Sequence, residues 1–417
     1  MRNKYTVIIF TIILSLICNV YDCYAAKIKN KTKKKNTKSE LIISVPKQSI
    51  VMDFDTGEVV SELNAHELCT PSSMTKIMTL YLVFEALVEG KLHLDEELPV
   101  SENAKNQEGS RSFFEAGSLV SVKNLILSMI VHSGNDACVV IAEKLAGDEE
   151  AFAALMNEKA EQFGLKNTHF TNSTGLPNEK HYSTMYDLAI ISRHIIADFP
   201  EYYRYFAEKT FTANGITQNN RNTLLGNSLN IDGLKTGHTK AGGFGIVISG
   251  KKNGKRLIAI VNGCKSEKAR AIEANKILAL GFNEYINVKV ASKDYPVTTA
   301  NVQFGKRDKV NLYTNENISA VIPKKYRKSL VISVNVNEPI PAPILHGTKV
   351  GTLTYKYGNY SSKEFELFVH EPVAKMNTVE RFSYNIKAWF NKNTTTPGLS
   401  SEKNEIHTTT DAEENIN

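Results

Sequence analysis

Three short groups of polar residues in this sequence could carry out acyl-transfer chemistry if the fold brought them together. Ser73 and Lys76 stand three positions apart, so on a helix the hydroxyl and the amine share one face. Ser133 precedes Asn135 by two positions, and Lys235-Thr236-Gly237 follows about 100 residues later. A serine beside an amine that is kept neutral becomes a nucleophile, and a second cation can bind an anionic group. The groups therefore predict a serine nucleophile with a lysine base.

A serine three residues before a lysine recurs along the chain, and local pattern separates the occurrences. Ser44 is followed by Val45-Pro46, which breaks a helix, Ser249 precedes a turn, and Ser400 lies in a polar tail. Only Ser73 opens a strong helical pattern. The N-terminus of a helix favours a developing oxyanion, so this occurrence suits the chemistry.

The elements around these groups predict an α/β (α+β) domain over 45–284. Alternating residues over 49–54 and 58–63, separated by a glycine-containing turn, predict a hairpin. Apolar residues at helical spacing predict helices over 74–87, 122–131, 137–145, 151–163, 185–196 and 272–280, and short apolar runs predict strands over 244–249 and 257–261. Ser133 then falls between two helices, and Lys235-Thr236-Gly237 leads into the strand that begins at Phe244. Strands at both sequence ends with helices between them fit a sheet flanked by helices.

The pattern of apolar and polar residues changes beyond Tyr285. Short alternating runs between turn residues predict a small all-β domain, a sandwich or barrel, over 285–372. Residues 373–392 repeat apolar residues at helical spacing among lysines and arginine, which is typical of an amphipathic helix on an anionic membrane surface. A helix packed on the β domain is the alternative. Residues 393–417 are acidic and polar, and their composition predicts a disordered tail.

The N-terminus predicts export. Arg2 and Lys4 precede a largely apolar stretch over 7–20, which is shorter than the roughly 20 residues of a membrane span and suits a secretory signal. Small residues at Cys23 and Ala25 place a cleavage site after residue 25, so 1–25 is expected to be a signal peptide. An uncleaved anchor is the alternative. Residues 26–44 form a lysine-rich linker.

The distribution of charge gives no support for a nucleic-acid partner. The net charge is +6, but residues 1–38 carry +8 and residues 393–417 carry −4, so the body is nearly neutral. No aromatic residues are interleaved with the basic run to stack on bases. Five cysteines in 417 residues do not make a disulfide scaffold, and no Cys/His cluster supports a metal or cofactor.

Order, spacing and setting of the three groups together resemble the D-alanyl-D-alanine carboxypeptidases, the low-molecular-mass penicillin-binding proteins. The resemblance rests on Pro-Ser-Ser-Met-Thr-Lys over 71–76, Ser-Gly-Asn-Asp-Ala over 133–137 and Asp-Gly-Leu-Lys-Thr-Gly-His-Thr over 232–239. Asn-Ser-Thr-Gly-Leu-Pro over 172–177 and His-Tyr-Ser-Thr over 181–184 add to it. One departure is Gly243, an extra glycine where the family usually has an aromatic residue.

The resemblance assigns a role to each residue. Ser73 would attack the D-Ala-D-Ala carbonyl, Lys76 would accept its proton, Ser133 would relay a proton to the leaving amine, and Asn135 would hold Lys76. The residues expected to bind the carboxylate end of the substrate are Lys235, Thr236, Gly237, His238, Arg270 and Arg221. Backbone N–H groups of Ser73 and His238 would form the oxyanion hole.

The implied function is removal of the terminal D-alanine from the peptidoglycan pentapeptide, with β-lactams as covalent inhibitors and without a cofactor or metal. The implied location is the periplasmic face of the inner membrane, held there by 373–392. A serine β-lactamase is the alternative within the class, although no acidic deacylating-base motif lies between Ser133 and Lys235. A weakly catalytic β-lactam-binding sensor is the alternative outside it.

Overall fold

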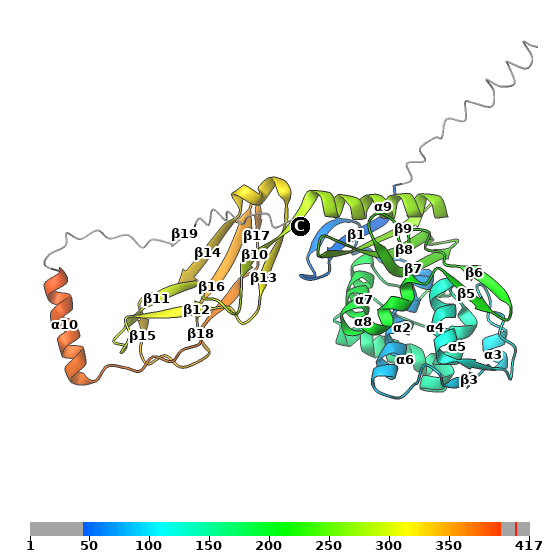
Figure 1. Cartoon of the computed structure of the whole chain (residues 1–417), viewed down its shortest axis with the longest axis horizontal. Coiled ribbons are helices and arrows are strands. Elements are labelled where there is room, and N and C mark those ends of the chain that lie inside the picture. The colour runs from blue at the N-terminus through cyan, green and yellow to red at the C-terminus, as the bar shows by residue number, and fades with distance from the viewer. Residues whose placement is uncertain (1–44, 393–404, 407–417) are drawn as a thin grey trace, which may run out of the picture. The chain divides into compact units, whose positions relative to one another are not determined.

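The computed structural model of the chain describes residues 45–392 and 405–406. A five-stranded antiparallel sheet forms the centre of residues 45–284 (Figure 1). In spatial order its strands are β2 (Val59–Leu63), β1 (Gln48–Asp53), β9 (Lys255–Cys264), β8 (Gly243–Lys252) and β7 (Ile231–Thr239). Strands from both ends of the sequence therefore lie side by side, as the pattern predicts.

Helices cover both faces of this sheet because its residues alternate. Ile50 and Met52 of β1 belong to one apolar cluster, whereas Val51 between them belongs to the other. The first cluster includes side chains of α2 (Lys76–Val88), α4 (Val122–Val131), α5 (Asn135–Ala146), α6 (Glu149–Gln162) and α7 (Met185–Asp198). The second is covered by α9 (Glu267–Glu284).

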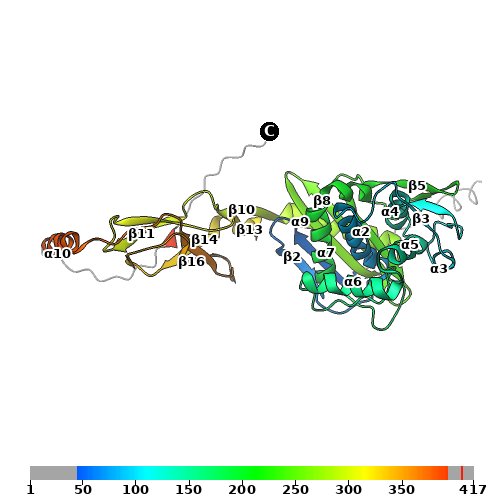
Figure 2. The same cartoon turned by 90° about the horizontal axis from the view of Figure 1, so that it is seen from below.

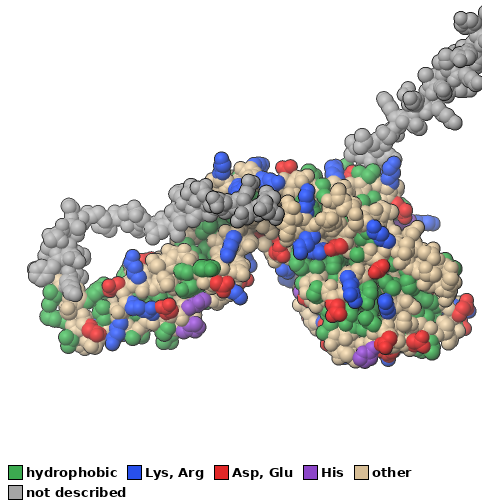
Figure 3. All heavy atoms as spheres, in the orientation of Figure 1, with side chains coloured by type: hydrophobic (Ala, Val, Ile, Leu, Met, Phe, Trp, Pro, Cys, Tyr) green, Lys and Arg blue, Asp and Glu red, His purple; other side chains and the backbone are tan. Residues whose placement is uncertain are grey.

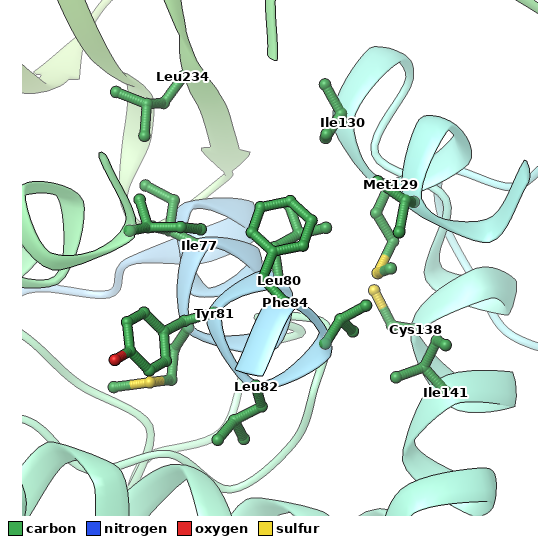
Figure 4. Close-up of a cluster of buried hydrophobic side chains, with 14 of the residues drawn as sticks. Ile77, Leu80, Tyr81, Leu82, Phe84, Met129, Ile130, Cys138, Ile141 and Leu234 are labelled. Carbon is green, nitrogen blue, oxygen red and sulfur yellow. The ribbon is translucent and has the colours of Figure 1, made fainter. Parts of the chain in front are cut away.

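The helix α2 lies at the centre of the first cluster. Figure 4 shows its side chains Leu80 and Phe84 facing Met129 of α4 and Cys138 of α5, with Leu234 of β7 near the same cluster. Burial of each such side chain stabilises the fold by about 1.5–3 kcal/mol. The packing fixes α2, and with it Lys76, against α5 and β7, which carry the other two groups.

Smaller elements fill the connections between these helices and strands. They are η1 (Ser72–Thr75), β3 (Glu97–Pro99), α3 (Glu102–Lys105), β4 (Leu119–Ser121), α8 (Pro200–Tyr203), η2 (Arg204–Ala207), β5 (Thr210–Ala213) and β6 (Ile216–Asn219). The strands β3 and β4 pair with each other, as do β5 and β6.

Residues from 285 onward form strands with a core of their own, which confirms the all-β prediction (Figure 2). The elements are β10 (Tyr285–Ala291), β11 (Thr298–Gln303), β12 (Lys309–Tyr313), β13 (Ile318–Pro323), η3 (Lys324–Ser329), β14 (Val331–Val336), β15 (Ile340–Pro341), β16 (Thr348–Tyr357), β17 (Tyr360–Ser361) and β18 (Phe365–Val369). The strands β10 and β13 form a pair, and the others form one sheet. Its core includes Leu312, Leu353 and Leu367, all fully buried.

Two elements follow this sheet. The helix α10 (Thr378–Lys392) falls within the segment predicted as amphipathic. The short strand β19 (Glu405–Ile406) pairs antiparallel with β14. The predicted signal peptide over 1–25, the linker over 26–44 and the rest of the acidic tail lie outside the described residues.

Most predicted elements of 45–284 are confirmed, and three details differ from the prediction. The group Lys235-Thr236-Gly237 lies inside its own strand, β7, and does not merely lead into the next one. The helix α9 begins at Glu267, five residues before the expected start, because the Ser266 hydroxyl accepts a hydrogen bond from the N–H of Ala269 and caps it. Ser73 lies in the 3-10 turn η1, and the α-helix starts at Lys76.

Candidate active site

Ser73 and Lys76 meet at the junction of η1 and α2. The Lys76 Nζ atom donates to the Ser73 Oγ atom over 3.3 Å, as the three-residue spacing predicts. Lys76 is fully buried, while Ser73 is half-buried and can be reached from outside. The hydroxyl is thus presented to a ligand with the amine behind it.

Lys76 is held by two further acceptors. Its Nζ atom donates to Oδ1 of Asn135 over 2.7 Å and to the carbonyl oxygen of Thr174 over 2.6 Å. Burial lowers the pKa of the Lys76 amine, and among the nearby charges that of Arg221 acts in the same direction. A base at this position needs such a shift, because an ordinary lysine is protonated at neutral pH.

Ser133 lies in the turn between α4 and α5, where the sequence predicts it. Its backbone is left-handed, with φ of 68°, and its Oγ atom is buried with no hydrogen-bond partner among the described residues. Asn135 begins α5, and its Nδ2 atom donates to the carbonyl oxygen of Glu108 over 2.6 Å. This bond leaves Oδ1 of Asn135 to face Lys76.

The strand β7 brings the third group beside η1. A Cβ atom on Gly237 would lie 3.0 Å from the carbonyl oxygen of Pro71, so the absence of a side chain allows the close approach. Lys235 is buried, and its Nζ atom donates to the carbonyl oxygen of Thr236 over 3.0 Å. Burial lowers the pKa of Lys235 well below its ordinary value, and the charge of Lys76 adds to this. The two amines therefore repel each other when both are charged.

His238 lies near the C-terminal end of β7 and is exposed. Its ring stacks on Phe244 of β8, with centroids 3.9 Å apart and an interplanar angle of 22°. Gly243, the extra glycine, has φ of 70°, and a Cβ atom there would lie 3.0 Å from the carbonyl oxygen of Cys264. The glycine thus permits the turn that places Phe244 against His238.

The two arginines expected at the site lie next to each other. Arg270, buried on α9, donates through Nη2 to the carbonyl oxygen of Arg221 over 3.1 Å, and its Nε atom has no partner among the described residues. Burial lowers the pKa of both guanidinium groups. Both positive charges also contribute to the lowered pKa of Lys235. The structure therefore places Arg221 and Arg270 near Lys235, which makes this end of the site cationic.

The roles of some residues in the site cannot be predicted from the sequence. Thr174 contributes a backbone carbonyl, which any residue could supply, although the run over 172–177 is part of the family pattern. His132 and His181 are both buried close to the site, yet a single histidine in a sequence does not reveal its surroundings. Within 45–392 and 405–406, no three potential metal ligands lie close enough together to hold an ion.

The site has a buried amine beside one hydroxyl, a second hydroxyl and a cationic end that suits a carboxylate. These are the features of acyl transfer to a serine. The class of fold and site is that of penicillin-binding proteins and serine β-lactamases. Comparison with known proteins identifies the family within this class. The chain belongs to the D-alanyl-D-alanine carboxypeptidase family, whose model matches residues 34–266. A second model, the C-terminal domain of penicillin-binding protein 5, matches residues 285–375.

Curated relatives and solved structures agree with this assignment. D-alanyl-D-alanine carboxypeptidase DacC of Escherichia coli is 39% identical over 332 residues, which are 78% of this chain and 83% of the relative. Penicillin binding protein 5 of Haemophilus influenzae superposes with a TM-score of 0.74 at 34% identity, covering 80% of this chain and 98% of that one. The chain is therefore a serine-type hydrolase with a carboxypeptidase domain and a β-rich C-terminal domain.

Another similar protein has been solved with β-lactams bound. Penicillin-Binding Protein D2 of Listeria monocytogenes, solved in cefotaxime-bound and ampicillin-bound forms, is 29% identical to this chain. Its TM-scores are 0.53 and 0.51, and the match covers 57% of this chain and 97% of that one.

Proposed function

We propose that this enzyme removes the terminal D-alanine from peptidoglycan pentapeptides through an acyl-enzyme on Ser73. The observation that carries the proposal is the 3.3 Å contact between the Lys76 amine and the Ser73 hydroxyl. Lys76, once neutral, takes the proton as the Ser73 Oγ atom bonds to the carbonyl carbon of the penultimate D-alanine. The peptide C–N bond breaks, D-alanine leaves with a proton on its amine, and water then hydrolyses the ester.

The remaining polar groups divide the other tasks. Ser133, whose Oγ atom has no partner among the described residues, passes a proton to the leaving amine. Asn135 keeps Lys76 aimed at Ser73 through its 2.7 Å hydrogen bond. Backbone N–H groups of Ser73 and His238 stabilise the oxyanion as it develops.

The substrate lies along β7 as an added strand. That strand is at the edge of the five-stranded sheet, so its outer backbone groups are available for pairing. Gly237 allows the substrate backbone to approach. The terminal carboxylate is bound at the cationic end of the site by Lys235, Arg270 and Arg221, together with Thr236 and His238.

Release of D-alanine from diacetyl-Lys-D-Ala-D-Ala tests the assignment. We expect the wild type to release D-alanine and to be labelled by a fluorescent penicillin, because a β-lactam presents a carbonyl and a carboxylate to the same groups. Ser73→Ala should lose both activities by at least about 1,000-fold while unfolding at an unchanged temperature. A wild type that takes up the label but releases no D-alanine would support the sensor alternative, and rapid cephalosporin turnover without release would support the β-lactamase.

We infer further that the enzyme is exported and held on the periplasmic face of the membrane by α10. Val379 and Phe382 on this helix are 78% and 69% exposed, although they are apolar. Such side chains on a helix rich in basic residues favour insertion into a lipid interface. Among the described helices, none is long and apolar enough to cross a bilayer.

A further inference from the structure

Two buried histidines border the proposed catalytic residues, and neither has a part in the reaction as described above. His181 is 2% exposed and His132 is 1% exposed. His181 is hydrogen-bonded to Thr75, one position before Lys76. His132, one position before Ser133, is hydrogen-bonded to Ser112. We propose that both are positioning residues, His181 for Lys76 and Ser73, and His132 for Ser133. The inference rests on the roles proposed for those three residues.

The contacts of His181 determine which of its nitrogens carries the proton. The backbone N–H of Thr171 donates to Nδ1 over 3.2 Å, so Nδ1 is the acceptor. The proton is therefore on Nε2, which lies 2.8 Å from Oγ1 of Thr75 and donates to it. A second proton on the ring would place two N–H groups against each other, so this geometry requires the neutral form.

Through these bonds His181 joins two segments that hold the base. Thr75 lies between Ser73 and Lys76 in η1, and Thr171 begins the loop whose Thr174 carbonyl accepts a hydrogen bond from Lys76. The loop and the turn are in direct contact, since a Cβ atom on Gly175 would lie 1.9 Å from the carbonyl oxygen of Ser72. The imidazole thus fixes the distance between the Lys76 amine and its acceptor.

His132 acts on the other proton carrier from the end of α4. Its Nε2 atom lies 2.7 Å from Oγ of Ser112, which in turn donates to Oγ of Ser128 over 2.5 Å. Because the Ser112 proton is used in that bond, His132 is the donor to Ser112 and its Nδ1 atom carries no proton. The backbone N–H of Ser112 also donates to Asp136 over 2.8 Å.

This network surrounds the turn that presents Ser133. Ser112 bonds to His132 before the turn and to Asp136 after it, so the left-handed Ser133 is held from both sides. Left-handed backbone in a residue other than glycine is strained and persists only where its surroundings impose it. A Cβ atom on Gly134 would lie 2.1 Å from Oγ of Ser128, which shows how closely the network fits the turn.

The surroundings of both rings disfavour a charge. Burial lowers the pKa of His181 to about 4, and the neighbouring His169 and Lys76 act in the same direction. Burial likewise lowers the pKa of His132 to about 4, with Arg221 and Lys235 as its neighbours. Both rings therefore stay neutral where the enzyme works, which suits a positioning role and not proton transfer.

Acylation kinetics of the full chain test the proposal. His181→Ala and His132→Ala should lower the rate constant for acylation by a fluorescent penicillin by about 10- to 100-fold. The KM for diacetyl-Lys-D-Ala-D-Ala should change less than about threefold, since neither ring contacts the substrate. Gln in place of each histidine keeps a donor and an acceptor and should restore most of the rate. His194→Gln, a half-buried histidine paired with Asp198 on α7, is the matched control and should leave the rate unchanged.

Partner variants keep the test decisive if an alanine variant does not fold. Thr75→Val removes the bond to His181, and Ser112→Ala removes the bonds to His132 and to Ser128. Both change the volume little, and each should reproduce the loss. In the double variants with the histidines the losses should not add, because each pair acts through one bond. Folded variants that acylate at the wild-type rate, or losses that add fully, would overturn the positioning roles. A wild type that is not acylated would instead count against the proposed function itself.

Discussion

Lys76 can accept a proton only when it is neutral, so the charges around it decide how the enzyme responds to pH. Burial is the largest cause of its lowered pKa, and Arg221 is the first of the neighbouring charges that act in the same direction. Arg221 also contributes to the lowered pKa of Lys235 and of His132. One guanidinium group therefore affects three titrating residues in addition to its proposed contact with the substrate.

Removal of this charge should move the pH profile of acylation. In Arg221→Gln the pKa of Lys76 rises, so less of the amine is neutral at a given pH and the acid limb shifts to higher pH. We expect the acylation rate at neutral pH to fall by roughly three- to tenfold, with most of the loss recovered in alkaline buffer. Rates measured with a fluorescent penicillin from pH 5 to 10 give the midpoint of the limb, which separates this effect from weaker ligand binding. Arg204→Gln, at an exposed arginine of η2, should leave the midpoint in place; an unmoved midpoint in both variants would contradict the argument.

At the scale of elements, the site depends on contacts between segments that are distant in sequence. The loop over 171–176 lies on η1 because Gly175 has no side chain and has φ of 81°. Its neighbour Thr174 supplies the carbonyl that holds Lys76, and the Thr79 hydroxyl donates to the carbonyl of Ser173 over 2.6 Å. The contact between this loop and η1 therefore contributes both to the stability of the fold and to the position of Lys76.

Gly175→Ala should lower both the stability of the fold and the rate of acylation. The added Cβ atom meets backbone, which cannot move aside as a flexible side chain could, and the left-handed conformation adds about 1–2 kcal/mol of strain. We expect the free energy of unfolding in urea to fall by more than about 2 kcal/mol and acylation to slow by at least about tenfold. Gly164→Ala has a similar φ of 71° but nothing within 4 Å, so it should show the strain alone with acylation intact. Equal effects of the two substitutions would show that the close contact does not matter.

The same elements show what the sequence can and cannot predict. Periodicity located α4 at 122–131, because its apolar face is continuous, and the motifs located Ser73, Lys76 and Ser133. Periodicity did not predict the strand β7, because its glycines and polar residues interrupt the alternation of apolar and polar residues. Its strand structure comes from pairing with β8. The carbonyl of Thr174 and the ring of His181 were missed because their roles arise only when the segments meet.

At the scale of the whole molecule, the body is nearly neutral and carries charges of both signs over its surface (Figure 3). The proposed attachment to an anionic membrane would then depend on a local feature. The helix α10 has two kinds of contact with its surroundings. The Arg381 guanidinium lies 4.2 Å from the ring centroid of Phe304, and the Tyr384 ring lies 5.8 Å from the same ring, whereas Val379 and Phe382 remain exposed. One side of α10 thus contacts the β-rich part, and the exposed side is the one that the proposed membrane attachment would use.

The exposed side gives a test that leaves the packed side intact. Val379→Asp with Phe382→Asp removes apolar area and adds two negative charges, and we expect at least about tenfold weaker binding to phosphatidylglycerol–phosphatidylethanolamine vesicles in co-sedimentation. Ser383→Asp with Asn385→Asp changes the charge by the same amount on exposed polar positions, so it isolates the electrostatic part and should weaken binding less. Neither pair should alter D-alanine release from a soluble peptide, because the proposed catalytic residues lie in 45–284. If the two pairs bind vesicles equally well, the apolar side chains do not enter the lipid, and α10 is better explained as a helix packed on the β-rich part.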